Sequence, residues 1–134
     1  MTIRARNRTL VAAILICVAA LAVSLLPMIA SSDPGAVRDV RIVVRDMAFY
    51  VDGGAEPNPP ITLRAGEQVR FRVRNEDAGM RHDFSVKAWT LGTRMLEDRG
   101  EEDEVIFRVP AERGTQTYQC TPHPRMMTGT IRVE

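Results

Sequence analysis

The stretch ITLRAGEQVRFRVRN, residues 61–75, carries the clearest structural signal in the chain. It contains a turn at Ala65-Gly66-Glu67, because a glycine with polar neighbours interrupts two β-rich runs. After the turn, apolar side chains alternate with arginines from Val69 to Arg74. A period of two places the apolar side chains on a buried face and the arginines in water, which is typical of a surface strand.

Other short stretches repeat this β-rich pattern along the chain. They are rich in β-branched and aromatic residues or alternate apolar with polar side chains, and they comprise residues 37–51, 82–86, 104–110, 115–120 and 130–134. The connecting residues 52–60 and 97–104 contain Gly, Pro or runs of charge, so we expect solvated loops there. Several short strands without a clear amphipathic helix predict an all-β sandwich or barrel.

The first thirty residues differ from the rest of the chain. Arginines in residues 1–9 precede a run from residue 10 to residue 30 that has no charged side chain. A bilayer-spanning helix needs about 20 apolar residues, whereas a cleaved signal has a shorter apolar core. We therefore expect residues 1–32 to form an N-terminal transmembrane helix that anchors the protein, with a signal peptide cleaved near residues 30–32 as the alternative. Because arginines favour the cytoplasmic side, the remaining chain is expected on the periplasmic or cell-surface side, anchored or, after cleavage, secreted.

The rest of the chain suits one small domain. Residues 33–39 form a polar linker, and residues 40–134 have the length of a single domain. The 18 basic and 17 acidic side chains of the chain nearly cancel, which argues against a nucleic-acid-binding surface. Cys17 lies in the apolar run, so Cys120 has no disulfide partner within the domain. An unpaired exported cysteine is buried and inert, paired between chains, or a functional thiolate.

One C-terminal segment bears on this choice. Residues 120–127 contain Cys120, His123, Met126 and Met127, and His82 is the chain's other histidine. Taken singly, each has an ordinary explanation as a core residue. Together, a thiolate and two imidazoles form a ligand set for copper, zinc or iron, and a thioether favours copper because zinc sites use Cys, His and carboxylate. Two imidazoles, a thiolate and a weak axial thioether make a blue-copper electron-transfer site.

The segment YQCTPHPRMMTGTIRVE, residues 118–134, resembles the C-terminal copper loop of the cupredoxins, the type 1 blue copper superfamily, and especially its plastocyanin- and amicyanin-like members. Residues 61–75, RHDFSV at 81–86 and FRVPAERGTQTYQC at 107–120 resemble earlier segments of the same family. The resemblance implies a Greek-key β-sandwich that holds one type 1 copper. It also implies that His82, Cys120 and His123 are the equatorial ligands and that a methionine is the axial ligand.

The resemblance leaves the axial ligand open between Met126 and Met127. Amicyanin-like spacing selects Met126, but the family's axial methionine is usually followed by x-Gly-x and the last strand, which fits MTGTIRV from Met127. We favour Met127. Many relatives have Asn after the first histidine, where this chain has Asp83. We expect Asp83 to accept a hydrogen bond from the Thr121 hydroxyl or from a loop N–H and so to orient the ligands.

The site as interpreted has no open position for a substrate, so we expect an electron carrier and not an enzyme. It would pass single electrons by Cu(II)/Cu(I) cycling between redox proteins, such as a cytochrome, an oxidase or a dehydrogenase, that dock near His123. Contact with the membrane is expected through residues 10–30 and no contact with nucleic acid. The alternative is a copper chaperone that delivers copper to an extracytoplasmic cuproenzyme, because a methionine pair offers soft ligands for Cu(I).

Overall fold

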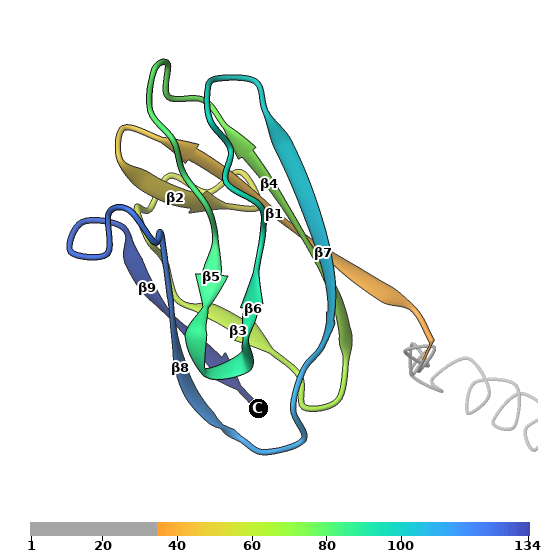
Figure 1. Ribbon diagram of the computed structural model, residues 1–134. Coiled ribbons are helices and arrows are strands. Elements are labelled where there is room, and N and C mark those ends of the chain that lie inside the picture. Colours follow the sequence, from red (N-terminus) through yellow and green to blue (C-terminus); the bar gives the residue numbers. More distant parts are fainter. Residues whose placement is uncertain (1–34) are drawn as a thin grey trace, which may run out of the picture. The chain divides into compact units, whose positions relative to one another are not determined.

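The computed structural model describes residues 35–134, which form two β-sheets (Figure 1). The first sheet has the order β2-β1-β4-β7 and contains β2 (Ala48–Val51), β1 (Val37–Arg45), β4 (Gln68–Asn75) and β7 (Glu102–Arg108). The second has the order β3-β9-β8-β5-β6 and contains β3 (Ile61–Leu63), β9 (Thr128–Val133), β8 (Gly114–Gln119), β5 (Ser85–Val86) and β6 (Leu91–Gly92). The only helix in this part of the chain is the 3-10 turn η1 (Lys87–Trp89). The all-β sandwich predicted from the sequence is confirmed.

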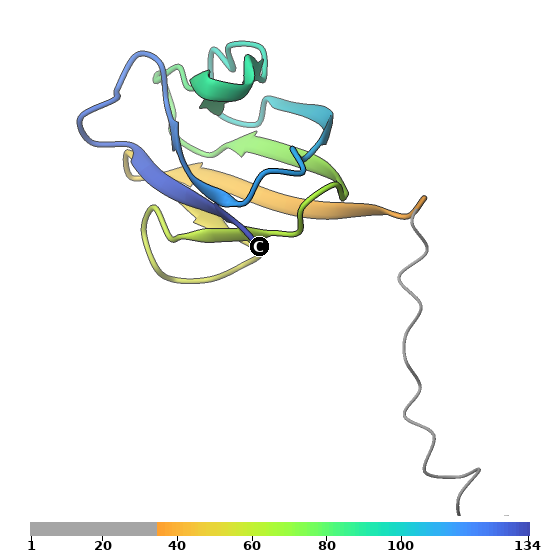
Figure 2. The same cartoon turned by 90° about the horizontal axis from the view of Figure 1, so that it is seen from below.

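Pairing in both sheets joins strands that are distant in the sequence. β1 pairs in parallel with β4, and β3 pairs in parallel with β9, whereas the other paired strands are antiparallel. Parallel partners cannot be joined by a tight hairpin, so the chain crosses between the sheets. In Figures 1 and 2 the loop between β8 and β9 lies at the end of the domain opposite the start of β1.

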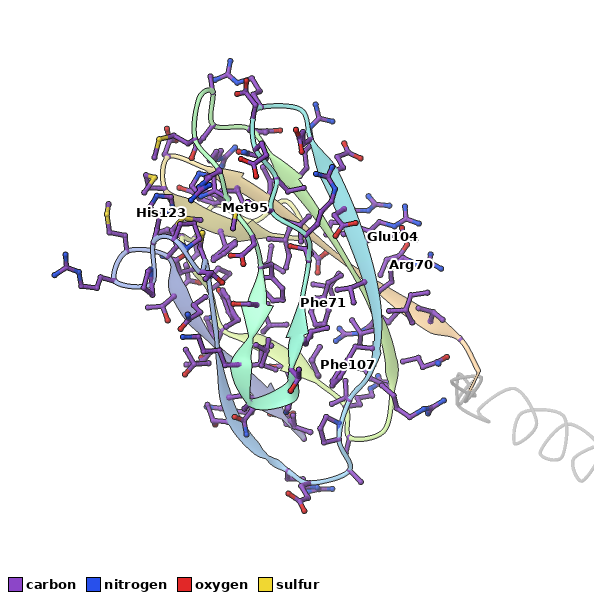
Figure 3. The ribbon with its side chains drawn as sticks, in the orientation of Figure 1. Arg70, Phe71, Met95, Glu104, Phe107 and His123 are labelled. Carbon is purple, nitrogen blue, oxygen red and sulfur yellow. The ribbon has the colours of Figure 1, made fainter. Side chains whose placement is uncertain are left out.

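The core lies between the two sheets. Val69, Phe71 and Val73 of β4 are at most 1% exposed, so the alternation predicted for this strand is confirmed. The ring of Phe71, labelled in Figure 3, lies 5.1 Å from that of Phe84, and the ring of Tyr118 in the second sheet lies 5.3 Å from Phe84. Burying side chains of this size stabilises the fold by roughly 1.5–3 kcal/mol each.

The acidic run expected in a loop at residues 97–104 belongs partly to a strand. β7 begins at Glu102, and its register with β4 places Glu102 opposite Arg74 and Glu104 opposite Arg72. Ion pairs of 3.1 Å and 3.3 Å join these side chains on the outer face of the sheet, where Figure 3 labels Glu104. The loop prediction was wrong for residues 102 and 103, whereas Glu104 had also been predicted as the first residue of a strand. The like charges are tolerated in the strand because arginines far away in the sequence neutralise them across the sheet.

Residues 37–51, continuous and β-rich in the sequence, form a hairpin. β1 and β2 are joined by Asp46 and Met47, which have positive φ angles of 50° and 58°. Two consecutive left-handed residues are the geometry of a two-residue type I′ turn, in which Gly, Asn and Asp are the usual residues. Asp46 suits this turn but Met47 does not, so other groups must stabilise the turn.

The predicted anchor or signal peptide in residues 1–32 lies outside the described residues. Within residues 35–134, no helix has the length and apolar character needed to cross a bilayer. β1 begins at Val37, so residues 37–39, which were expected in the linker, are already part of the sheet.

Candidate metal centre

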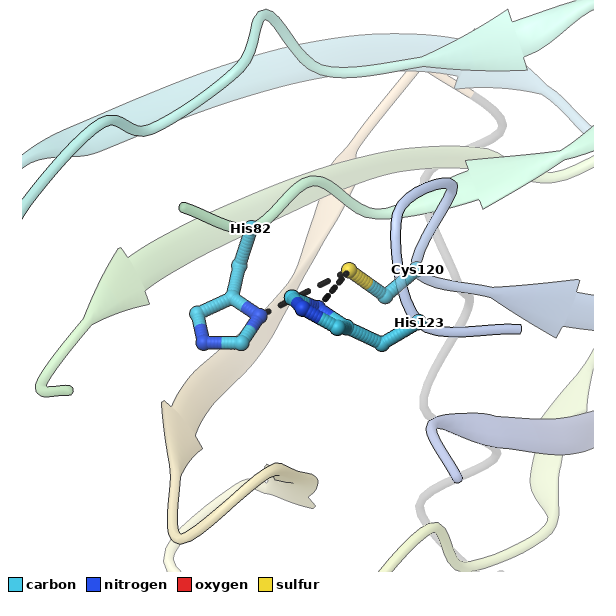
Figure 4. Close-up of side chains that lie close together, drawn as sticks. All are labelled: His82, Cys120 and His123. Atoms are coloured by element: carbon cyan, nitrogen blue, oxygen red, sulfur yellow. Dashed lines mark hydrogen bonds between the residues drawn. The ribbon is translucent and has the colours of Figure 1, made fainter. Parts of the chain in front are cut away.

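Three residues singled out from the sequence converge at one end of the sandwich. The Sγ atom of Cys120 lies 3.6 Å from Nδ1 of His82 and 3.6 Å from Nδ1 of His123 (Figure 4). The three donor atoms lie within 4.8 Å of one another. His82 comes from the segment before β5, whereas Cys120 and His123 come from the loop after β8. The fold thus brings together side chains from two distant segments.

Backbone hydrogen bonds close the loop between β8 and β9. The N–H of Cys120 donates to the carbonyl of Met127 at 3.0 Å, and the N–H of Met127 donates to the carbonyl of His123 at 2.9 Å. The N–H of His123 in turn donates to the carbonyl of Cys120 at 3.2 Å. Because the last strand pair is Gln119 with Thr128, the hairpin register places Cys120 and Met127 side by side at its end.

The two methionines of this loop differ in exposure. Met127 is completely buried, whereas Met126 is 61% exposed. Met127 is separated by an even number of positions from Ile131 and Val133 in β9, so all three side chains point to the same, buried face. Of the two methionines, only Met127 is enclosed with the buried Cys120.

His82 is fixed by its backbone and by a carboxylate. Its N–H and carbonyl pair with the backbone of Leu96 at 2.9 Å and 2.8 Å, and its side chain is completely buried. Its Nε2 atom lies 3.2 Å from Oδ2 of Asp77. Asp77 was not singled out from the sequence, where an aspartate before Ala78-Gly79 has the ordinary explanation of a turn residue.

Asp83 links the two segments of the site. It is only 7% exposed, and its Oδ1 accepts the backbone N–H of Thr121 at 2.5 Å. The hydroxyl of Thr121 instead lies 3.4 Å from the hydroxyl of Ser85. The sequence left open whether Asp83 accepts a hydrogen bond from the Thr121 hydroxyl or from a loop N–H, and in the structure it accepts the loop N–H. This bond joins the His82 segment to the residue that follows Cys120.

Burial changes the protonation of two donors. It raises the pKa of the Cys120 thiol to about 11 and lowers the pKa of the His82 imidazole from its usual value. In the metal-free protein at neutral pH, Cys120 is therefore a neutral thiol and His82 a neutral imidazole. A metal ion binds the thiolate, so metal binding at this site releases a proton.

The two nitrogen–sulfur distances fit a metal ion. Bonds of about 2.0 Å to an imidazole nitrogen and about 2.3 Å to a thiolate sulfur, at an angle of roughly 110–120°, place nitrogen and sulfur about 3.5–3.7 Å apart. The two N–S distances of 3.6 Å agree with this spacing. A thiolate, two imidazoles and an enclosed thioether form a soft donor set, which suits copper.

A family model supports this chemistry. The model of the copper binding proteins of the plastocyanin/azurin family matches residues 58–134, more than half of the chain. The matched range contains His82, Cys120, His123 and Met127. No curated protein matches the chain by sequence.

Solved structures share the fold. Auracyanin A, a "blue" copper protein of Chloroflexus aurantiacus, superimposes with a TM-score of 0.57 at 20% identity, over 74% of this chain and 100% of its own. Auracyanin of Roseiflexus castenholzii gives a TM-score of 0.59 at 18% identity, over 75% of this chain and 99% of its own. Rusticyanin of Thiobacillus ferrooxidans gives 0.57 at 21% identity, over 75% of this chain and 79% of its own. At these identities the likeness concerns the fold.

The sandwich and the donors at its end define a protein of the blue copper electron-transfer class. The chain belongs to the copper-binding proteins of the plastocyanin/azurin family, and its cofactor is a single type 1 copper. The resemblance noted in the sequence is thereby confirmed.

Proposed function

We propose that His82, Cys120, His123 and Met127 hold this copper and that the domain carries single electrons between redox proteins outside the cytoplasm. The observation that carries the proposal is the convergence of the chain's two histidines on the buried Cys120, within 4.8 Å. Burial of Met127 favours it over Met126 as the axial ligand. Copper in such a ligand set supplies a one-electron Cu(II)/Cu(I) couple.

The protein contributes a rigid, dry set of donors. Cys120, His82 and Met127 are completely buried, so water does not reach them. The Leu96 bridge fixes the His82 segment, and the β8–β9 hairpin fixes the other donors. Donors that cannot shift between two oxidation states keep the reorganisation small. An enclosed site also leaves no position for a substrate, which favours electron transfer over catalysis.

His123 offers the path for electrons to the surface. It is partly exposed, and its Nδ1 faces Cys120, so the opposite edge of the ring is nearer to solvent. The same loop carries the exposed side chains of Pro124, Arg125 and Met126. A redox partner with an apolar contact surface and acidic groups at its rim complements this loop. A cytochrome, an oxidase or a dehydrogenase with such a surface is the expected partner.

The location of the domain is part of the proposal. Residues 10–30 are uncharged and long enough to span a bilayer, and arginines precede them. This pattern supports a domain held at the outer side of the membrane, where it meets its redox partners.

Visible and EPR spectra of the purified protein with Cu(II) test the proposal. We expect one copper per chain and an intense thiolate-to-Cu(II) charge-transfer band, which Cys120→Ser abolishes. A copper chaperone that holds only Cu(I) would lack this band. A protein that binds zinc tightly and stays colourless with Cu(II) would rule out the proposed ligand set.

A further inference from the structure

A carboxylate lies directly behind the buried histidine of the metal centre. Nδ1 of His82 faces Cys120 at 3.6 Å, and the opposite ring nitrogen, Nε2, lies 3.2 Å from Oδ2 of Asp77. Figure 4 shows Nδ1 directed toward the sulfur and the other ring nitrogen directed away from it. The Asp77 side chain is 16% exposed and the His82 side chain is completely buried, so this contact is largely shielded from water.

The partners of Asp77 determine which atom donates in this contact. Its Oδ1 accepts the backbone N–H of Asp46 at 2.7 Å, and its Oδ2 accepts that of Met47 at 3.1 Å. An ionised carboxylate only accepts hydrogen bonds, so the proton in the third contact belongs to Nε2 of His82. A neutral imidazole has one N–H, which leaves the lone pair on Nδ1, the atom that faces Cys120.

Asp77 is itself held from two sides. Its backbone N–H donates to Oδ1 of Asn75 at 2.9 Å, and Asn75 is completely buried. The two N–H groups that reach the carboxylate belong to Asp46 and Met47, the left-handed residues of the β1–β2 turn. Non-glycine residues adopt this conformation at a cost, and the carboxylate offsets it by pairing both turn amides. The oxygen that meets His82 is therefore fixed by the hairpin and by β4.

We propose that Asp77 is a positioning residue of the copper site, a role that rests on the proposed function. By accepting Nε2–H, it selects the tautomer of His82 with a free Nδ1 and holds the ring in the orientation that copper needs. A carboxylate behind a metal-bound histidine also makes the ring a stronger donor. Because Cu(II) carries more charge than Cu(I), the stronger donor and the negative charge favour the oxidised state, so Asp77 lowers the reduction potential.

Two variants of the full-length protein test this role beside a matched control. Asp77→Asn keeps the size of the side chain but leaves one oxygen for three donors, and Asp77→Ala removes all three contacts. The control is Glu76→Gln, which removes one negative charge from the residue next to Asp77. The Glu76 carboxylate pairs with Arg74 at 3.7 Å. The readouts are the reduction potential, the affinity for Cu(II), and the ring nitrogen signals of His82 in two-bond 1H–15N spectra of the metal-free protein at neutral pH.

We expect affinity for Cu(II) to fall by about 10- to 100-fold in the Asp77 variants, more in Ala than in Asn. A tenfold loss for Cu(II) with no loss for Cu(I) corresponds to a rise in potential of about 59 mV. The metal-free wild type should show His82 as the pure Nε2–H tautomer, and Asp77→Ala should show a mixture. Glu76→Gln should leave the tautomer and the Cu(II) affinity unchanged.

The proposal is overturned if Asp77→Asn shifts the potential no more than Glu76→Gln, or if the tautomer of His82 is the same without the carboxylate. Failure of the proposed function would give a different result. A wild-type protein that shows no thiolate-to-Cu(II) band would refute the copper ligand set, while the spectra of metal-free His82 would still decide whether Asp77 sets its tautomer.

Discussion

Gly129→Ala should destabilise the fold strongly, although the change adds only one methyl group. Gly129 of β9 pairs with Tyr118 of β8 across the hairpin that carries the copper loop. A Cβ atom on Gly129 would lie 2.3 Å from both Cζ and Oη of the Tyr118 ring. Carbon atoms in contact are usually about 3.5–4.0 Å apart, so the ring or the strand must shift by roughly 1.2 Å or more.

The Tyr118 ring has no room for such a shift. It is completely buried, lies 5.5 Å from the ring of Phe49, and donates its hydroxyl proton to the carbonyl of Pro59 at 2.7 Å. Overpacking a core costs about 1–3 kcal/mol, and breaking a buried hydrogen bond costs about 1–3 kcal/mol more. We therefore expect the free energy of unfolding to fall by about 2–6 kcal/mol, out of a total of about 5–15 kcal/mol for a typical protein.

Urea unfolding of the metal-free protein, followed by circular dichroism and by Trp89 fluorescence, measures this loss. Gly92→Ala is the matched control, because its Cβ would meet its nearest neighbours at an ordinary 3.7 Å, and it should change the stability by no more than about 0.5 kcal/mol. In a Tyr118→Leu background the ring is absent, so Gly129→Ala should cost much less. If Gly129→Ala is as stable as Gly92→Ala, or costs the same in both backgrounds, the clash does not explain the glycine.

Four further predictions concern the axial ligand, the proton of the Cys120 thiol, the stability at high pH and the membrane. Met127→Leu should shift the reduction potential and the visible spectrum, whereas Met126→Leu should change both little; voltammetry that shows the reverse pattern would assign the axial position to Met126. Copper loading at neutral pH should release a proton from the Cys120 thiol, whose pKa is about 11, and Cys120→Ser should lack this release when it is followed with an indicator dye in weak buffer. The folded metal-free protein keeps this proton at pH values where the unfolded chain loses it, so stability to urea should fall as the pH rises from about 9 toward 11. Most of the protein should stay with membranes after a high-salt wash, and a mature N-terminus near residues 31–33 would instead show that the apolar segment is cleaved.

The class of fold and the candidate donors could be predicted from the sequence because both rest on local signals. Alternation in residues 69–74 requires one buried face wherever the strand pairs, and Val69, Phe71 and Val73 are indeed buried. The possible thiolate and imidazole donors were confined to a few positions, since the chain has two histidines and two cysteines, and one of the cysteines, Cys17, lies in the apolar segment. Their number made the copper chemistry predictable before their distances were known.

Pairing between distant strands decided what the local signals could not. The acidic residues 102–104 look like a loop until arginines of β4 neutralise them across the sheet. For Met126 and Met127 the sequence pattern already favoured the second, and the register of β8 with β9 agrees, because one step along the chain turns a side chain from solvent to core.

Asp77 is the clearest case of a residue whose role is invisible in the sequence. Its carboxylate meets the Asp46–Met47 turn because β1 lies beside β4, which brings the hairpin to the loop that follows β4. The turn amides hold the carboxylate that His82, five residues further along the chain, meets. The sequence by itself determined which donor atoms are present and that the chain forms strands with a buried face. The tertiary structure decided how the carboxylate behind His82 is held, because its hydrogen bonds to the β1–β2 turn join segments some thirty residues apart and so depend on strand pairing and not on local composition.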